Sequence, residues 1–443
     1  MRPPRAVVLA LVFALALPVA VVLLGDRAAP LCPGCNVVVI SLDTLRADRT
    51  GVYTAGLPTT PALDRMASGS VVFERAISQS AWTRPAHASM FTGLYPSEHG
   101  IVAMSERRRL HPELPTLASA LGRAGYRRAA FTGGANMAAE FGFDSGFEVY
   151  RSDGRRLEDN LGSALEWISA ADERPFFLFL HGFDPHRPYR SEPADRRALG
   201  LPGQRTRGLK QACQSGRAPD NLDRHLAEYD AAVHRGDRSL GRFLAGLDEL
   251  GHGSDTVVVF TSDHGEEFFE HGRCFHIRTL YREVVEVPLV IRVPGLEPRR
   301  VPAPVPASVA VAPTVLGVVG APRHGVAGPS LVDALMGKGW DGRFVVSETS
   351  SRWAKGRDSG HVRAATRADD KIVRWLSAQR SEYFDLSTDR AENRALEPGR
   401  RGRALESALD AWVEQHGPRL EAPAHGPLPD RLARKLRALG YVD

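Results

Sequence analysis

The stretch NVVVISLD, residues 36–43, places a run of mainly β-branched side chains directly before an aspartate. A run of this kind, without alternation of apolar and polar residues, is typical of a strand buried on both faces, as in a parallel sheet covered by helices. Ligands of open α/β sheets bind outside the carboxyl ends of the strands. We therefore expect Asp43 to lie at the functional edge of a central sheet.

The chain beyond this strand alternates between strand-like and helix-like patterns. Apolar runs typical of strands occupy residues 71–76, 128–132, 176–180, 256–261 and 287–293, and helical patterns occupy residues 60–66, 114–123 and 226–250. Thr60 is the expected N-cap of the first of these helices, with Pro61 in its first turn. The alternation predicts an α/β fold with a mostly parallel central sheet sandwiched by helices.

A different pattern begins near residue 322. Short strands are expected at residues 344–347, 362–365, 371–376 and 382–385, followed by a helix at residues 400–415. We therefore expect a smaller C-terminal antiparallel α+β subdomain (322–443), a catalytic α/β domain (36–321) and a leader with linker (1–35). The apolar residues of the segment 190–223 have no clear period. We expect this segment, called the excursion below, to be an irregular loop on the surface.

The N-terminus has the pattern of an export segment. Arg2 and Arg5 precede an uncharged stretch that runs to Leu24. At about 1.5 Å per residue this stretch spans roughly 28 Å, close to the thickness of a bilayer core. A cleaved signal peptide and an N-terminal membrane anchor both fit. Either one predicts a periplasmic or extracellular protein.

Composition and cysteine content agree with an exported globular enzyme. The 443 residues carry 57 basic and 52 acidic side chains, a mixed surface with a net charge of +5. No basic run is interleaved with aromatic residues, so a nucleic-acid partner is not expected. Cys32 and Cys35 lack a second CxxC to complete a zinc site, so a local disulfide or free thiols are expected. A pairing of Cys213 with Cys274 is left open by their spacing.

Polar residues follow the predicted strands where chemistry is expected. Asp43 follows the first strand, Asp263 and His264 follow the strand at residues 256–261, and the strand at residues 176–180 is followed by a third group, which comprises His181, Asp184 and His186. A single loop residue of this kind is usually only exposed and polar. Convergence from three strand ends instead predicts a metal-assisted site.

Thr83 precedes a predicted helix that includes Pro85 and is ended by Gly93. Free amides and the helix dipole at such a position favour an alkoxide and a bound oxyanion. A nearby divalent ion would lower the pKa of the hydroxyl group further. Taken alone, the pattern is explained better by a residue that only caps the helix.

These motifs, in this order, resemble the sulfatases and their relatives in the alkaline phosphatase superfamily. The matching blocks are SLDTLRADRTG (41–51), TPALDRMA (60–67), TRPAHASMFTGLYPSEHG (83–100), HGFDPHRPY (181–189), AEYDAAVHRGDRSLGRFL (227–244), SDHGEEFFEHG (262–272), LYREVVEVPLVIR (280–292) and EYFDLSTDRAENRAL (382–396). Each block is weak alone, but together and in register they imply the fold and a metal–oxyanion site.

The resemblance assigns roles to individual residues. Asp43, Asp263 and His264 match metal ligands, and Thr83 matches the nucleophile that also touches the metal. His87 stands where sulfatases keep an arginine that supports the nucleophile.

Three further histidines match the substrate side of the site. The resemblance implies that His186 contacts the ester oxyanion or leaving group. His276 occupies the region where many relatives bind the anion through a lysine, and His271 is expected to point into the same pocket.

The chain departs from the sulfatase pattern at the nucleophile. Sulfatases convert the Cys or Ser of a C/S-x-P-x-R motif to formylglycine, whereas this chain has Thr83 and His87 at the two defining positions. The β-carbon of threonine carries a methyl group and cannot become that aldehyde. Relatives with a threonine nucleophile act mostly on phosphorus, so the resemblance implies a phosphate or phosphonate ester hydrolase.

The metal set also departs from the all-oxygen calcium set of many sulfatases. His264 supplies a nitrogen, which shifts the preference toward Mn²⁺ or Zn²⁺, although Ca²⁺ or Mg²⁺ would also fit. The Asp, Thr, Asp, His set resembles that of phosphonate monoester hydrolases and envelope transferases. A second metal would need further ligands, and the spacing of Asp184, His186, His271 and His276 does not match cleanly. We therefore expect one divalent ion.

Further functions remain open from the sequence. An envelope phosphoethanolamine- or phosphoglycerol-type transferase would use the same nucleophile with a lipid donor, although such enzymes usually carry several membrane spans. A sulfuric ester hydrolase without formylglycine and a non-catalytic binder of anionic glycans also fit the motifs. Each would take a small-molecule, glycan or lipid ester as its partner.

Overall fold

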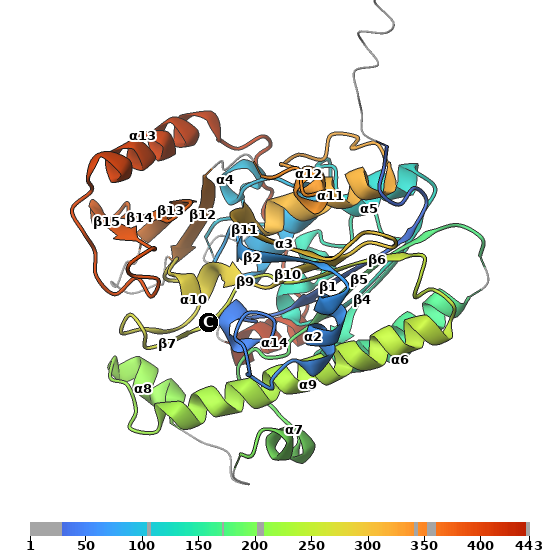
Figure 1. Cartoon of the computed structure of the whole chain (residues 1–443), viewed down its shortest axis with the longest axis horizontal. Helices are drawn as coiled ribbons and strands as arrows, with labels where there is room; N and C mark the ends of the chain where they lie inside the picture. The colour runs from blue at the N-terminus through green and yellow to red at the C-terminus, as the bar shows by residue number, and fades with distance from the viewer. Residues whose placement is uncertain are drawn as a thin grey trace, which may run out of the picture.

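The computed structural model describes residues 29–103, 108–170, 172–201, 208–340, 344–351 and 360–439. It shows a large α/β body and a smaller antiparallel sheet beside it (Figure 1). The large sheet has the order β11-β2-β10-β6-β1-β5-β3-β4, with β9 paired to β2. Most neighbours are parallel, and β10 runs antiparallel to both β2 and β6. The predicted fold class is confirmed.

The elements have the following bounds. The strands of the large sheet are β1 (Asn36–Leu42), β2 (Val71–Ile77), β3 (Arg127–Gly133), β4 (Val149–Gly154), β5 (Phe176–Gly182), β6 (Thr256–Ser262), β9 (Glu286–Val287), β10 (Leu289–Arg292) and β11 (Arg299–Pro306). The helices of the large body are α2 (Pro61–Ser68), α3 (Thr83–Thr92), α4 (Pro96–His99), α5 (Leu117–Arg123), α6 (Leu157–Ser169), α7 (Pro193–Ala198), α8 (Leu209–Ser215), α9 (Leu222–Glu249), α10 (Arg282–Val285), α11 (Ser308–Val319) and α12 (Val332–Leu335). Short elements near the site are η1 (Ala47–Arg49), η2 (Ala135–Met137), η3 (Ala139–Phe141), β7 (Glu267–Phe268) and β8 (Cys274–Phe275).

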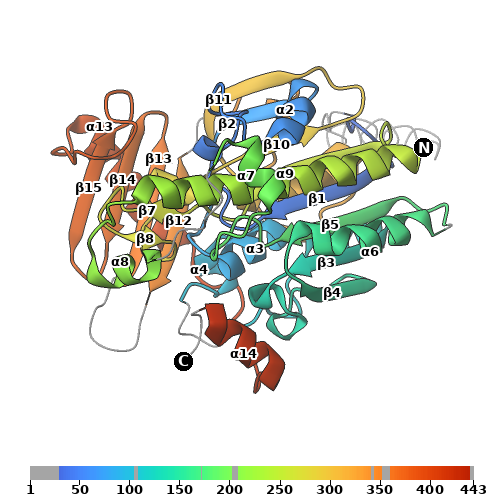
Figure 2. The ribbon, with the colours of Figure 1, turned by 90° about the horizontal axis from the view of Figure 1, so that it is seen from below.

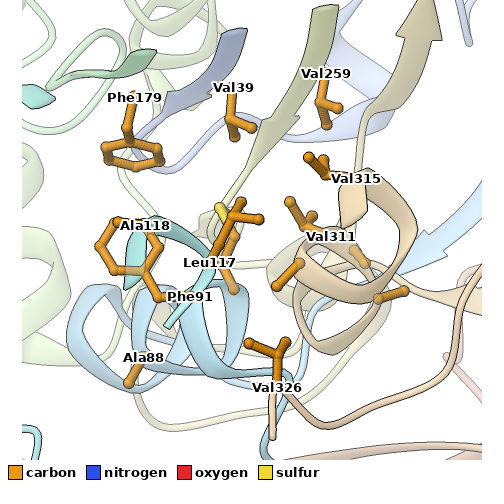
Figure 3. Packing of buried hydrophobic residues seen from close by; sticks show 14 of the residues in the cluster. Val39, Ala88, Phe91, Leu117, Ala118, Phe179, Val259, Val311, Val315 and Val326 are labelled. Carbon is orange, nitrogen blue, oxygen red and sulfur yellow. The ribbon is translucent and has the colours of Figure 1, made fainter. Parts of the chain in front are cut away.

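Strand β1 is buried on both faces, as its continuous apolar run predicted. Val37 and Val39 belong to the core cluster that also contains residues of α3, α5 and α11. Figure 3 shows this layer, with Val39 facing the helices. Val38 and Ile40 belong to the opposite cluster, which contains residues of α2, α6 and α9. Two covered faces explain why no polar alternation marks this strand.

The smaller sheet is antiparallel throughout and has the order β12-β13-β14-β15. Its elements are β12 (Val345–Ser351), β13 (Gly360–Arg367), β14 (Asp370–Trp375), β15 (Arg380–Asp385) and α13 (Arg400–Gln415). One face packs on residues of the large body such as Leu280 and Val284, and the other packs on Leu405 and Leu409 of α13. The antiparallel pairing predicted from the short strands is therefore present.

The chain after α13 returns to the large body. Ala422, Leu432 and Leu436 belong to the same core cluster as Met137 and Phe141. Helix α14 (Asp430–Leu439) lies beside η2, near β3 and β4 (Figure 2). The last described residues thus contribute to the large body, in which the site lies.

Some elements differ from the sequence-based expectation. The expected strand at residues 287–293 is divided into β9 and β10 at Pro288, which has no amide hydrogen to donate to a ladder. The excursion at residues 190–223 contains the short helices α7 and α8. Disulfides join Cys32 to Cys35, and Cys213 to Cys274. The second of these fastens α8 of the excursion to β8.

The apolar N-terminal stretch that predicted a signal or an anchor lies outside the described residues. Among the residues that are described, no helix combines the length and the apolar character needed to cross a membrane.

Helix α2 begins at Pro61 after Thr60, as predicted, but the Thr60 side chain does not cap it. Asp237 of α9 takes this role instead, since its two carboxylate oxygens accept the amides of Ala62 and Leu63, each at 2.8 Å. The cap therefore also fastens α2 to α9.

We expect Asp237→Ala to lower the free energy of unfolding by about 2 kcal/mol, because it removes a cap and leaves two buried amides without an acceptor. Urea unfolding checks this. Glu249→Ala, at an exposed position of the same helix, is the control and should change the value little. Equal stability of the two variants would contradict this capping role.

Candidate metal centre and active site

Three neighbouring parallel strands end at the same edge of the sheet. Leu42 of β1 is paired with Gly182 of β5 on one side and with Ser262 of β6 on the other. The residues after β1 and β6, Asp43 and Asp263, therefore emerge side by side. Both are fully buried.

Thr83 reaches this edge from a helix N-terminus. It is the first residue of α3, Trp82 is the N-cap, and Gly93 ends the helix with a φ of 72°. Thr83 is therefore inside the helix rather than its cap. Its Oγ1 donates to Asp43 Oδ2 at 3.5 Å, and the side chain is fully buried. The hydroxyl thus lies beside the Asp43 carboxylate.

Asp43, Asp263 and His264 form a group with the geometry of metal ligands. His264 Nε2 lies 3.8 Å from Asp43 Oδ1 and 3.3 Å from Asp263 Oδ2. Each of these three atoms is buried without a hydrogen-bond partner. Ligands about 2.1 Å from a tetrahedral ion are about 3.4 Å apart. The unpartnered atoms and their spacing therefore fit a divalent cation.

The other polar atoms of Asp263 and His264 form hydrogen bonds to the protein backbone. Asp263 Oδ1 accepts the amides of Thr44 at 3.2 Å and His264 at 2.9 Å. His264 Nδ1 lies 2.9 Å from the carbonyl of Gly265, which can only accept, so Nδ1 carries the proton and Nε2 presents a lone pair. Such outer contacts hold ligands in a fixed orientation.

The electrostatics of the group call for a cation. Burial and the neighbouring Asp263 carboxylate raise the pKa of Asp43 well above its usual range. Burial would also raise the pKa of Asp263, but the imidazoles of His264, His87 and His181 hold it below its usual value. Two carboxylates buried together are costly unless a positive charge lies between them. A divalent ion would supply that charge.

His181 is a further nitrogen at the group. It is on β5, and its Nδ1 lies 2.8 Å from the carbonyl of Gly133, so Nε2 presents a lone pair. That Nε2 is buried, unpartnered and 3.7 Å from Asp43 Oδ2. We placed His181 among the strand-end residues but assigned it no role. The sequence signal for His181 was its position at the end of the third predicted strand. The direction in which its side chain points could not be predicted, because it depends on β5 lying next to β1.

His87 forms hydrogen bonds to the first turn of α3 and to β1 rather than presenting a free ligand atom. Its Nδ1 lies 2.9 Å from the carbonyl of Thr83, and its Nε2 lies 3.1 Å from Ser41 Oγ. Nδ1 is also 3.7 Å from Asp263 Oδ2. Because the carbonyl requires a proton on Nδ1, that nitrogen has no lone pair for a metal. Burial lowers the pKa of His87, which favours the neutral ring.

A row of imidazoles leads away from the candidate metal ligands. The ring centroid of His276 lies 4.6 Å from that of His264 and 5.2 Å from that of His186. Glu266 Oε1 accepts from His276 Nδ1 at 2.8 Å. Burial, then the neighbouring His264, lowers the pKa of His276 well below its usual value. For His186, burial and then His276 lower the pKa to about 3. The structure therefore brings these two predicted residues together beside the candidate ligand His264.

Two other candidates are engaged elsewhere. Asp184 forms a buried ion pair with Arg235 and accepts the amide of Leu157, so it is held by structural partners. His271 Nδ1 lies 2.9 Å from Glu283 Oε1, and its Nε2 lies 3.0 Å from the carbonyl of Glu392. We expected His271 in the same pocket as His276, but its described contacts join it to a separate acidic group.

The family of the chain follows from comparison with known proteins. The sulfatase family model matches residues 35–321 of the 443, which is more than half of the chain. The chain therefore belongs to the sulfatase family.

Individual relatives are more distant. The chain is 27% identical to human N-sulphoglucosamine sulphohydrolase over 49% of its own length and 48% of the relative's. It is 26% identical to the ulvan-active sulfatase of Formosa agariphila over 60% of its length and 57% of the relative's. The alignments thus span about half the length of these two ester hydrolases. The phosphonate monoester hydrolase of Agrobacterium radiobacter shares the fold, with a TM-score of 0.71 and 21% identity over 90% of this chain and 98% of that one.

The pair of His271 with Glu283 predicts a pH-dependent stability. Burial works in the opposite direction, but the hydrogen bond and charge of Glu283 raise the pKa of His271 from 6.5 to about 9. The folded protein then holds this proton more tightly than the unfolded chain. The resulting stability is fully present below pH 6.5 and is lost as the pH rises through 9.

We therefore expect the melting temperature to fall between pH 6.5 and pH 9, and to fall less in the His271→Gln variant. Thermal unfolding at steps of pH measures both. Parallel curves for the two proteins would rule out His271 as the titrating group.

Proposed function

We propose that this protein is a metal-dependent hydrolase of phosphate or phosphonate esters that uses Thr83 as its nucleophile. The observation that carries the proposal is the position of the Thr83 hydroxyl, which lies 3.5 Å from Asp43 Oδ2 at the start of α3. A hydroxyl in this place has a cation site on one side and free helix amides on the other. Both stabilise negative charge on oxygen.

The ion would be held by Asp43, Asp263 and His264, with His181 as a further nitrogen and Thr83 in contact. When bound, it would lower the pKa of the threonine hydroxyl and neutralise the ester oxygens. Two imidazole nitrogens in the set favour Mn²⁺ or Zn²⁺ over Ca²⁺ and Mg²⁺. The unpartnered atoms converge on one position, which supports a single ion.

The identity of residue 83 favours phosphorus over sulfur. The methyl group on the threonine β-carbon excludes the formylglycine route of sulfatases. A threonine alkoxide can instead attack phosphorus directly. The sulfate ester route therefore requires a nucleophile that this chain does not have at position 83.

The proposed reaction has two steps. Thr83 Oγ1 gives its proton to Asp43 Oδ2, to which it already donates, and attacks phosphorus in line. An O–P bond forms, and the P–O bond to the leaving alcohol breaks. The alcohol oxygen takes a proton from an imidazole of the site. Water then attacks the phosphothreonine and gives a proton back to that imidazole, the O–P bond to Thr83 breaks, and the proton held by Asp43 returns to the threonine oxygen as the phosphate or phosphonate leaves. The free amides at the start of α3 hold the non-bridging oxygens in both steps.

His276 is better supported than His186 as the proton donor. Burial and His264 lower the pKa of His276 in the substrate-free protein, so the ring would take up its proton only with the anionic ester bound, and Glu266 behind Nδ1 at 2.8 Å would then balance the charge. Its ring is also the nearer of the two to the ligand His264. His186 Nδ1 instead faces its neighbour's carbonyl at 2.6 Å. We assign His186 to the contact with the leaving group.

An exported location is part of the proposal. The N-terminal sequence has the pattern of a signal peptide or anchor. Both cysteine pairs of the chain form disulfides, which persist in oxidising compartments such as the periplasm. The substrate would therefore be an ester found outside the cytosol.

We expect Thr83→Ala to lower kcat/KM for an aryl phosphodiester by about a thousandfold or more, because the attacking oxygen is removed. Thr83→Ser, which keeps a hydroxyl, should retain measurable activity. Release of the arylalcohol is the readout, and mass spectrometry should detect a phosphorylated peptide containing residue 83. Wild-type activity in Thr83→Ala would rule out this nucleophile.

Removal of ligands should remove the ion. We expect about one equivalent of Mn or Zn per wild-type chain, and a loss of most of it in Asp263→Asn and in His264→Ala, because each removes a ligand from the set. Elemental analysis after gel filtration measures the content. His252→Ala is the control and should keep the ion, because His252 contacts Asn36 and Asp255 at the end of β1 and β6 opposite to the ligand set. Full metal content in Asp263→Asn would contradict the site.

A further inference from the structure

A cavity of about 570 Å³ opens beside the row of imidazoles, and His186 is part of its wall. The cavity is lined by Gly134, Ala135, Gly154, Arg155, Arg156, Asp159, Phe183, His186, Arg187, Pro188, Arg190, Arg235, Lys435 and Ala438. The walls thus come from the carboxyl ends of β3 and β4, the start of α6, the loop after β5, helix α9 and helix α14. Figure 2 shows α14 lying beside β3 and β4. A cavity of this volume holds a small organic ligand rather than a lone ion.

The lining is strongly cationic. Five arginines and Lys435 face a single acidic residue, Asp159. Two of the arginines are already neutralised, since Arg156 pairs with Asp159 at 3.0 Å and Arg235 is held by Asp184. The remaining four basic residues are left without an ion pair among the described residues, and they are Arg155, Arg187, Arg190 and Lys435.

The positive charges crowd one another at the α14 side of the cavity. Burial, then Arg431, and also Arg155, lower the pKa of Lys435, while Asp153 acts in the opposite direction. Like charges gathered in a concave surface are favourable only when an anion neutralises them. Guanidinium groups present forked donors that match sulfate, phosphate and carboxylate oxygens.

The cavity lies next to the proposed reaction centre, and His186 and His276 connect the two. The His186 ring that lines it lies 5.2 Å from His276, which in turn lies 4.6 Å from the metal ligand His264. A substrate whose ester reaches the metal ligands would therefore extend its remaining part past His186 toward the basic wall. The anion bound there would belong to the same molecule as the ester.

We propose that this cavity binds a second anionic group of the substrate, and that the preferred substrates carry at least two anionic groups, as an acidic oligosaccharide ester does. The inference rests on the proposed ester hydrolysis and names the class of substrate for that same site. Arg190 and Lys435 are the residues to test, because Arg190 is exposed, Lys435 is half-buried, and neither contacts the metal ligands or Thr83.

The test compares two aryl phosphodiesters in the full-length enzyme. One is p-nitrophenyl phenyl phosphate, and the other carries a sulfonate on the phenyl ring that is not the leaving group. We expect a KM about tenfold lower for the sulfonated ester in the wild type. Arg190→Ala and Lys435→Ala should raise that KM severalfold to tenfold and leave kcat and the KM of the unsubstituted ester unchanged. Arg434→Ala, at an exposed position of α14 outside the cavity, is the matched control.

The outcomes separate the two proposals. If the wild type cleaves neither ester, the proposed function fails. If it cleaves both with the same KM, or if the variants keep the wild-type preference, only the cavity assignment fails. If inorganic sulfate inhibits cleavage of the unsubstituted ester and Lys435→Ala merely relieves that inhibition, the cavity holds a free anion and the assignment is also overturned. The preference should disappear at high salt, since it is electrostatic.

Discussion

The burial of two carboxylates side by side is the constraint on which the rest of the site depends. Asp43 and Asp263 lie together because β1 is flanked by the parallel strands β5 and β6 in the same register. Neither side chain is accessible to water, and each keeps one oxygen without a partner. Burial of that charge is costly without a cation, so the strand order of the sheet itself creates a demand for a metal ion.

The elements around the two carboxylates place groups that compensate their negative charge. Helix α3 directs its positive N-terminal end and the Thr83 hydroxyl toward the carboxylates. Imidazoles, which can be neutral and still bind a metal, occupy the neighbouring positions at His181 and His264. Beyond them, His276 and His186 lead to the basic cavity. Positive charge therefore increases from the buried cluster toward the wall formed by α14, in the direction that an anionic substrate would lie.

Much of this arrangement could be predicted from the sequence because it follows local rules. The β-branched run of β1 and the residues at strand ends identify the sheet and place Asp43, Asp263 and His264 at its edge. Edge strand β11 was not predicted because its three prolines weaken the strand pattern. Helix α11 was not predicted because it is apolar on all sides and so shows no helical period of apolar and polar residues. The direction of His181, the separate contacts of His271 and the cavity under α14 depend on tertiary neighbours. None of these three features can be predicted from the residue pattern of a single segment.

Anomalous diffraction at the metal absorption edge, from crystals grown with Mn²⁺ or Zn²⁺, tests the central claim most directly. We predict one peak within about 2.0–2.3 Å of Asp43 Oδ1, Asp263 Oδ2 and His264 Nε2, with the Thr83 hydroxyl in contact with the ion. A structure with no peak at these atoms, or with the ion bound instead among Glu267, His271 and Glu283, would contradict it.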